Sequence, residues 1–301
     1  MEQPLVTIAI PCLNEGDIIK RAFLSCRNQT YKNIEIILSD AGSDNDETLQ
    51  FLKDAETIPN VRVLYHIKGI SKYDNWTAMV RSSKGKYILI LPARHILYPE
   101  GIAKLVKPFE KNQDLGYVRG CMVYEEPDGK KSKWIPSEYS SLVDSAAELK
   151  KLLIGNTCEV ITTLYDLDKL KKSLPFNTNF ERTFVWFQNA KIASNWPVYF
   201  VNADIGQWTN WETLEQLVQK TKTATTELPT LVEAIVALAP NIKNSPNKLS
   251  VINNTVLTHK TANRNSLIVT FKNIFPKSFI LVSLFYFRQV VFRLIPSILG
   301  K

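Results

Sequence analysis

The sequence predicts an α/β fold whose sheet binds a ligand at the carboxyl ends of its strands. Residues 6–10 form an apolar, β-branched run stopped by Pro11, which is typical of a buried parallel strand. Apolar residues then recur at helical spacing over 18–26, behind capping side chains at 14–17. A second strand is predicted at 35–39. Because a polar turn follows each strand, this order places a ligand site at that edge of the sheet.

Several short motifs accompany these elements. The first fifty residues contain PCLNE at 11–15, NQTY at 28–31 and EIILSDAGS at 35–43. A second block follows, with KGKYILIL at 84–91 and YPEG at 98–101. Together the motifs resemble the inverting family 2 glycosyltransferases of the GT-A fold. The resemblance implies a Rossmann-like mixed sheet flanked by helices and a nucleotide-sugar donor.

By this resemblance, the turns after the first two strands form the walls of a nucleotide cleft. Asp40 would lie beside the base and ribose, where a carboxylate can accept a hydrogen bond from a base N–H or a ribose hydroxyl. The family's second acidic residue is Ala41 here. The alternatives are that Asp40 caps its own turn and that the opposite wall caps the first helix. The residues implicated are Pro11, Asn14, Glu15, Asp40, Gly42 and Ser43.

A third part of the cleft is implied by the segment at 69–74. It resembles a Gly-Ile-Tyr-Asp stretch found in part of the family, with two extra residues. The resemblance implies that Lys72 or Asp74 approaches the nucleotide. The alternative is an exposed loop residue without a function.

The end of the strand predicted at 87–91 departs from the family. The family has Asp-x-Asp here, whose last carboxylate holds Mg²⁺ or Mn²⁺ against the diphosphate, whereas this chain has LPARH at 91–95. Hard divalent cations need oxygen ligands, and Arg94 supplies none. A guanidinium can instead bind a diphosphate directly through bidentate hydrogen bonds. We therefore expect Arg94 to replace the metal, and no metal cofactor to be required.

Two alternatives stay open at this position. The site has lost its activity, or a metal is held by carboxylates from another loop, such as Asp44 or Asp46. A chelator would abolish activity in the second case. His95 is either a phosphate partner or an ordinary surface histidine.

The resemblance also implies a catalytic base before an aromatic-rich helix, which is predicted at 184–191. An acceptor hydroxyl attacks from the face opposite the leaving diphosphate, so a carboxylate there can take its proton. Glu181 is the only carboxylate available, since Arg182 stands where the family has Asp. The alternative is a surface glutamate in a salt bridge. A loop is predicted at 204–211, where tryptophans could contact a sugar or pack in the core.

Length and composition indicate the domain organisation and the cellular compartment of the protein. A chain of 301 residues that is 45% hydrophobic can bury a sizeable core. We expect a catalytic domain at 1–215 and a helical extension at 216–301. The four cysteines show neither metal spacing nor a disulfide framework, which favours a reduced, cytoplasmic protein. A core strand begins close to Met1, so no secretory signal is expected.

The net charge of +8 is concentrated in the C-terminal segment. Residues 241–301 contain nine basic and no acidic residues, interleaved with bulky apolar ones. Their most apolar uncharged run, 278–287, is shorter than the ~20 residues needed to span a bilayer. The pattern favours an amphipathic helix on an anionic membrane surface. The alternative is packing on the catalytic domain or in a homodimer, and nucleic acid is not an expected partner.

The sequence therefore predicts an enzyme that moves a hexosyl or related group, with inversion, from a nucleotide sugar, most simply a UDP-sugar. The acceptor would be a glycan or a lipid-linked molecule at the inner face of a membrane, as in polysaccharide biosynthesis. The alternative is an inactive GT-A domain that binds nucleotide or glycan, or serves as a scaffold subunit.

Overall fold

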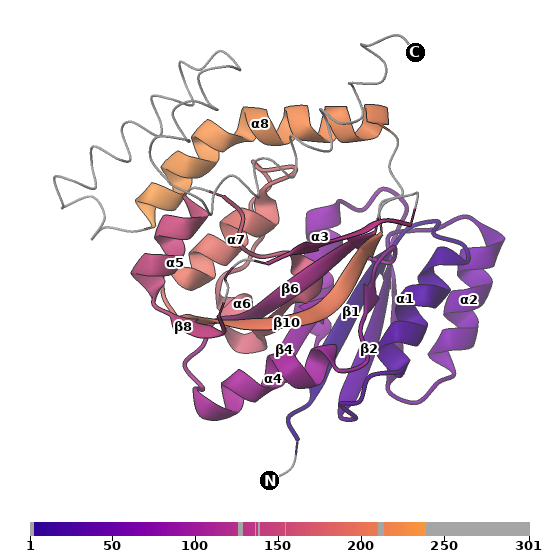
Figure 1. Cartoon of the computed structure of the whole chain (residues 1–301). Coiled ribbons are helices and arrows are strands. Elements are labelled where there is room, and N and C mark those ends of the chain that lie inside the picture. The colour runs from indigo at the N-terminus through magenta and orange to yellow at the C-terminus, as the bar shows by residue number, and fades with distance from the viewer. Residues whose placement is uncertain are drawn as a thin grey trace, which may run out of the picture.

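A mixed β-sheet flanked by helices organises the chain (Figure 1). The computed structural model describes residues 3–125, 129–135, 137, 139–153, 155–209 and 214–238. The strands of these residues are β1 (Val6–Cys12), β2 (Ile34–Asp40), β3 (Val61–Tyr65), β4 (Tyr87–Ile90), β5 (Ile96–Leu97), β6 (Tyr117–Glu125), β7 (Lys131–Trp134), β8 (Ser141–Val143), β9 (Thr163–Asp166) and β10 (Val198–Thr209). The helices are α1 (Ile18–Arg27), α2 (Asp46–Glu56), α3 (Lys72–Ser82), α4 (Gly101–Lys111), α5 (Ser145–Leu152), the 3₁₀ turn η1 (Val160–Thr162), α6 (Leu167–Lys172), α7 (Phe184–Ala193) and α8 (Leu214–Ala237).

The strand order is β3-β2-β1-β4-β9-β6-β10-β5, with β7 paired to β6 and β8 to β10. The first four strands of this order are parallel, and β9 is antiparallel to both of its neighbours. The carboxyl ends of β1 to β4 therefore meet at one edge, as predicted, and the binding of a ligand there stays a prediction.

The first strand is longer than predicted because it continues through Pro11. Proline lacks a backbone N–H, so it is tolerated in a strand only where no ladder bond is lost. The pairing of β1 with β4 ends at Ala9, whose carbonyl accepts from Leu91. Because the backbone polar groups of successive residues face opposite sides of a strand, Pro11 faces β4 as Ala9 does, but it lies beyond the last bond to β4. Its neighbours Ile10 and Cys12 continue to pair with β2. The polar turn therefore begins two residues later than expected.

The returning strand predicted near 196–201 is also longer. The prediction of a loop at 204–211 is wrong for residues 204–209, because β10 continues to Thr209. Irregularities in the pairing with β6, between Val201 and Gly206, shift the register. They allow the end of β10 to pair on its other side with β5. Residues 210–213, including Trp211, lie outside the described residues.

Helix α8 crosses the top of the molecule and contacts α7 (Figure 1). Its second half is anchored by Leu231, Val232 and Ile235, which are buried. The predicted boundary at residue 215 falls within its first turn, and the predicted basic segment from Asn241 onwards lies outside the described residues. Among the described helices, none combines the length and apolar composition that crossing a membrane requires.

Candidate active site

The turns after β1 and β2 are joined through Asn14. Its backbone has a positive φ of 53°, and its side-chain oxygen accepts from the backbone N–H groups of Asp44 and Asn45 at 3.0 and 3.1 Å. Its amide donates to the Asp44 carboxylate at 2.9 Å, and its backbone N–H donates to Ser43 Oγ at 2.9 Å. The predicted capping segment 14–17 contains the N-cap residue of α1, Asp17, but the side chain of Asp17 makes no capping bond. Asn14 instead fixes the turns after β1 and β2 relative to each other.

Asp40 lies at the end of β2 and is almost fully buried. Both of its carboxylate oxygens accept from the backbone N–H of Ser43, each at 3.1 Å, and Ser43 Oγ donates to one of them. The turn-capping alternative for Asp40 is therefore confirmed, and its contact with a nucleotide stays a prediction. Gly42 adopts a φ of 86° in this turn, and a Cβ there would lie 2.5 Å from Lys68 Cα. The cleft wall thus has the close backbone packing that only glycine permits.

Arg94 projects from the loop after β4 toward the turn after β1. Its Nε donates to the Glu15 carboxylate at 3.1 Å, and about half of the Arg94 side chain is exposed, against 15% for Glu15. Two of the predicted cleft residues are thereby brought together at the carboxyl edge of the sheet.

His95 follows Arg94 and is 6% exposed, so the alternative of a surface histidine is wrong. Its ring stacks on Trp208 of β10 with centroids 4.1 Å apart. Trp208 reaches His95 because β10 continues past residue 204, where a loop was predicted. One face of the Trp208 indole is thus used to pack on His95, the neighbour of Arg94.

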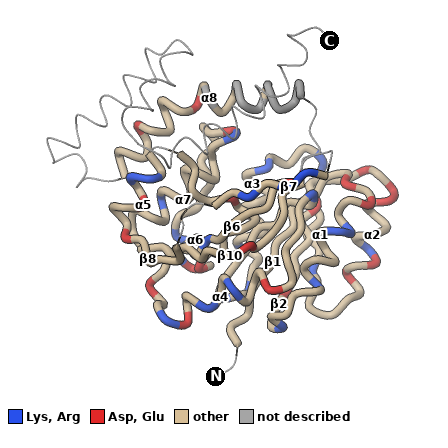
Figure 2. Tube along the Cα trace, in the orientation of Figure 1, with Lys and Arg blue, Asp and Glu red and all other residues tan. Residues whose placement is uncertain are grey.

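The side chains at the end of β4 do not fit a divalent cation. Residues 91–95 offer no carboxylate. Acidic residues gather on the loop leading into α2 (Figure 2), but Asp44 there is paired with Lys68 and Asn14. Within the described residues, no three His, Cys, Asp or Glu side chains are grouped as metal ligands.

Helix α3 is attached to the loop that precedes α7. Lys72 Nζ donates to the Glu181 backbone carbonyl, and Tyr73 Oη donates to that of Phe180 at 3.1 Å. Burial lowers the pKa of the Lys72 ammonium, and the Glu181 carboxylate opposes this shift. Asp74 bonds with Ser71 at the start of α3, its Oδ2 accepting from Ser71 Oγ at 2.7 Å. The structure therefore joins Lys72 to the candidate base and gives Asp74 a capping role.

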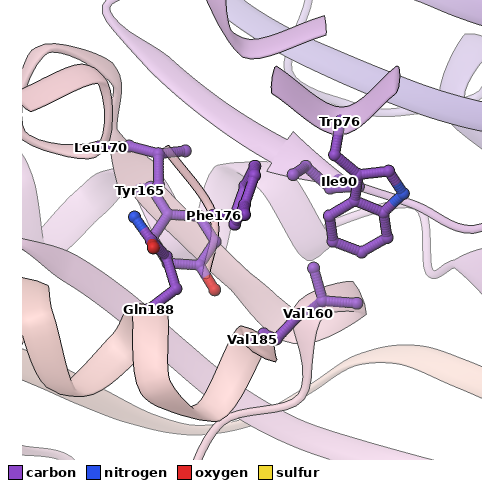
Figure 3. Close-up of a pocket in the computed structure, with 8 residues that line it drawn as sticks. All are labelled: Trp76, Ile90, Val160, Tyr165, Leu170, Phe176, Val185 and Gln188. Atoms are coloured by element: carbon purple, nitrogen blue, oxygen red, sulfur yellow. The ribbon is translucent and has the colours of Figure 1, made fainter. Parts of the chain in front are cut away.

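Aromatic packing fixes α3 against α7. Trp76 and Tyr73 make edge contacts with Phe184, with ring centroids 5.1 and 5.4 Å apart. Beneath them is an apolar void of about 10 Å³ (Figure 3). Its lining residues are Trp76, Ile90, Val160, Tyr165, Leu170, Phe176, Val185 and Gln188. The predicted aromatic helix is confirmed, and its aromatic side chains pack α7 against α3.

Glu181 itself is exposed, and the backbone around it is held by Glu227 of α8. Glu227 could not be predicted from the sequence, because it lies 46 residues from Glu181 in a helix where no motif or spacing marks it. Likewise, no local pattern indicates that Trp208 packs on His95.

Comparison with known proteins agrees with this architecture. Residues 7–172, more than half of the chain, match the family described as Glycosyl transferase family 2. The chain belongs to that family.

The curated relatives are similar over part of their length. An uncharacterised glycosyltransferase of Methanocaldococcus jannaschii is 23% identical over 186 residues, which cover 61% of this chain and 62% of the relative. The chondroitin synthase of Pasteurella multocida is 34% identical over 128 residues, covering 42% of this chain and 13% of the synthase. The chain thus spans less than two thirds of the length of these relatives.

Solved structures share the fold. The crystal structure of residues 1–349 of S. aureus TarS has a TM-score of 0.61 at 12% identity, over 87% of this chain and 73% of that one. The same protein in complex with UDP has a TM-score of 0.58 at 14% identity, also over 87% and 73% of the two chains. Its complex with UDP-GlcNAc has a TM-score of 0.57 at 12% identity, over 85% and 81%. The described residues therefore have the GT-A fold, in agreement with membership of glycosyl transferase family 2.

Proposed function

We propose that this protein transfers a sugar from a UDP-sugar to a hydroxyl acceptor with inversion, using Arg94 where the family uses a metal ion. The observation that supports this most directly is the position of Arg94 on the carboxyl edge of the sheet, paired with Glu15 of the cleft wall. The TarS complexes with UDP and UDP-GlcNAc support UDP as the nucleotide of the donor.

The proposed role of Arg94 is to stabilise the leaving diphosphate. Negative charge develops on the β-phosphate as the bond to the anomeric carbon breaks, and a fixed cation lowers the energy of that transition state. The pairing with Glu15 holds the guanidinium in place before the donor binds. A guanidinium can bind phosphate oxygens through bidentate, charge-assisted hydrogen bonds, which is the contact proposed for Arg94.

The proposed role of Glu181 is that of general base. The acceptor oxygen forms a bond to the anomeric carbon, the acceptor proton passes to the Glu181 carboxylate, and the bonding electron pair leaves with UDP. Support comes from the exposure of Glu181 and from the attachment of its loop to Lys72 and Tyr73 of α3. Asp40, Ser43 and Pro11 would line the nucleotide end of the same cleft.

The proposed acceptor is a glycan or a lipid-linked molecule at the cytoplasmic face of a membrane. This part of the proposal depends on the basic, amphipathic composition of residues 241–301. Removal of residues 266–301 should reduce co-sedimentation with anionic vesicles. Equal binding by the truncated and full-length chains would refute a membrane role for this segment.

A transfer assay tests the proposed chemistry. The purified chain is incubated with a panel of UDP-sugars and with glycan and lipid-linked acceptors, and both UDP release and product are measured. Glu181→Gln should lower kcat by about 10²-fold or more. Glu110→Gln, the same change at an exposed position of α4, should have no effect. Full activity of Glu181→Gln would refute its role as base, and absence of transfer by the wild type would favour the scaffold alternative.

Variants of Arg94 test the proposed replacement of the metal. Arg94→Ala should lower kcat by about 10²- to 10³-fold. Since this change leaves the Glu15 carboxylate without its guanidinium partner, the variant combining Arg94→Ala with Glu15→Gln separates loss of the cation from an added repulsion. An activity of both variants equal to wild type would contradict the proposed role.

A further inference from the structure

Four hydrogen-bond donors converge on the carboxylate of Glu227. Glu227 Oε1 accepts from the backbone N–H of Glu181 at 2.6 Å and of Arg182 at 3.2 Å. Glu227 Oε2 accepts from the backbone N–H groups of Arg182 and Thr183 at 3.1 and 2.9 Å, and from Thr183 Oγ1 at 2.7 Å. Three consecutive peptide groups of the loop before α7 are thus held by one side chain of α8.

Through this contact, Glu227 of α8 caps the N-terminus of α7. Thr183 is the N-cap residue, but its side chain makes no capping bond to its own helix and donates to Glu227 instead. A carboxylate is favoured at this position because the helix dipole and the N–H groups near the N-terminus attract negative charge. Hydrogen bonds to an ionised acceptor are also about twice as strong as neutral ones. The loop should therefore be rigid only while the Glu227 carboxylate is present.

The position of Glu227 is itself fixed by the core. It lies one turn before Leu231, which is fully buried, and Val232 and Ile235 continue the same buried contact. Pro229 lies between the carboxylate and this anchor, where it removes one backbone donor from the helix. The half-buried carboxylate is thus carried on an element that is packed against α7.

Glu181 is held on both sides. Its backbone N–H donates to Glu227 of α8, and its backbone carbonyl accepts from Lys72 of α3. With both of its backbone polar groups fixed by opposite neighbours, the direction in which the Glu181 side chain leaves the backbone is determined. Glu227 does not itself have to reach a substrate to affect the reaction.

We infer that Glu227 is a positioning residue that holds the candidate base Glu181 in the geometry for proton transfer. This inference rests on the proposed function. It assigns to α8, which follows the residues matched by the family, a part in assembling the acceptor side of the site. The donor side is built by the loops after β1, β2 and β4, so Glu227 should affect kcat and leave the KM for the donor unchanged.

The experiment compares Glu227→Gln and Glu227→Asp with Glu233→Gln, the same amide change at an exposed position of the same helix. Steady-state transfer kinetics are combined with hydrogen exchange of the peptide covering residues 177–187, and thermal unfolding confirms that each variant is folded. Glu227→Gln should lower kcat about 10- to 100-fold, because a small misplacement of a catalytic group has effects of that size. The donor KM should stay within about twofold, and exchange at residues 181–183 should accelerate.

Glu227→Asp retains the charge and should recover part of the lost kcat, while Glu233→Gln should match wild type in both measurements. Faster exchange in Glu227→Gln with wild-type kcat would overturn the inference, since the loop would then be released without consequence for catalysis. Unchanged exchange would overturn it as well. The proposed function fails in a different way, through absence of transfer by the wild type or full activity of Glu181→Gln.

Discussion

Glu148 of α5 is fully buried beside Arg119 of β6, and its removal gives the sharpest stability prediction for this fold. Glu148 Oε2 accepts from Arg119 Nη2 at 2.7 Å. Its other oxygen accepts from Tyr117 Oη at 3.0 Å and from Thr157 Oγ1 at 2.7 Å. Burial alone would raise the pKa of Glu148, but Arg119 and the hydroxyl donors lower it, so the carboxylate is ionised.

The magnitude follows from what Glu148→Ala leaves behind. The Arg119 side chain is 1% exposed, so the variant would retain a buried guanidinium without its counter-charge. Breaking a buried ion pair in this way costs about 3–5 kcal/mol. Two further guanidinium atoms, Nε and Nη1, already have no hydrogen-bond partner within the described residues. The pair is therefore expensive to bury. Arg119→Met combined with Glu148→Leu and Tyr117→Phe removes both charges and the buried hydroxyl that would lose its acceptor, and should restore stability to within about 1 kcal/mol of wild type.

Urea unfolding monitored by circular dichroism measures both variants. Glu148→Ala should shift the midpoint to lower urea, and the triple variant should return it close to the wild-type value with an unchanged slope. A loss of less than about 1 kcal/mol in Glu148→Ala would refute the reasoning, because it would mean that the guanidinium finds water or another acceptor.

Two further predictions concern the cleft wall and pH. Gly42→Ala should destabilise the protein by about 1–3 kcal/mol and weaken UDP binding, because its φ is 86° and the new Cβ would meet the backbone of Lys68. Gly69→Ala is the control. Its φ is 88° and the space around it is open, so this variant tests only the cost of a positive φ for alanine. Burial raises the pKa of Glu159 from 4.5 to about 7. Between these two values the unfolded chain holds fewer protons, so the free energy of unfolding should fall as pH rises, by at most about 3 kcal/mol. Unfolding measured on both sides of this window should show no such fall in Glu159→Gln.

The parts of the fold that the sequence predicts well are those with local patterns. The strands near 6–12 and 34–40 are continuous buried runs, and the helices beginning at Ile18 and Phe184 have clear apolar composition. Their boundaries depend on neighbours instead. Pro11 fits in β1 because the pairing of β1 with β4 has already ended at Ala9. Nothing in residues 6–12 themselves indicates where that pairing ends.

The candidate site was predictable only where a motif marks it. The turns of Asn14 and Asp40 carry motifs, and the structure joins them. Their internal bonds are tertiary: Asn14 binds across to residues 44 and 45, while capping of α1 was the local expectation. Glu227 has no signal in sequence, since its four donors lie 44 to 46 residues away. Side chains that act across such separations are found only when the elements are placed in space.

The affinity for UDP in the absence of metal tests the central claim most directly. Isothermal titration calorimetry in EDTA is performed on the wild type, on Arg94→Ala and on the variant combining Arg94→Ala with Glu15→Gln, and each titration is repeated with Mn²⁺. The proposed arginine site predicts that the wild type binds UDP in EDTA, and that loss of Arg94 weakens binding about tenfold or more, as expected for a charge-assisted bidentate contact. Addition of Mn²⁺ should not restore the lost affinity. Binding that requires Mn²⁺, or equal affinity with and without Arg94, would contradict it.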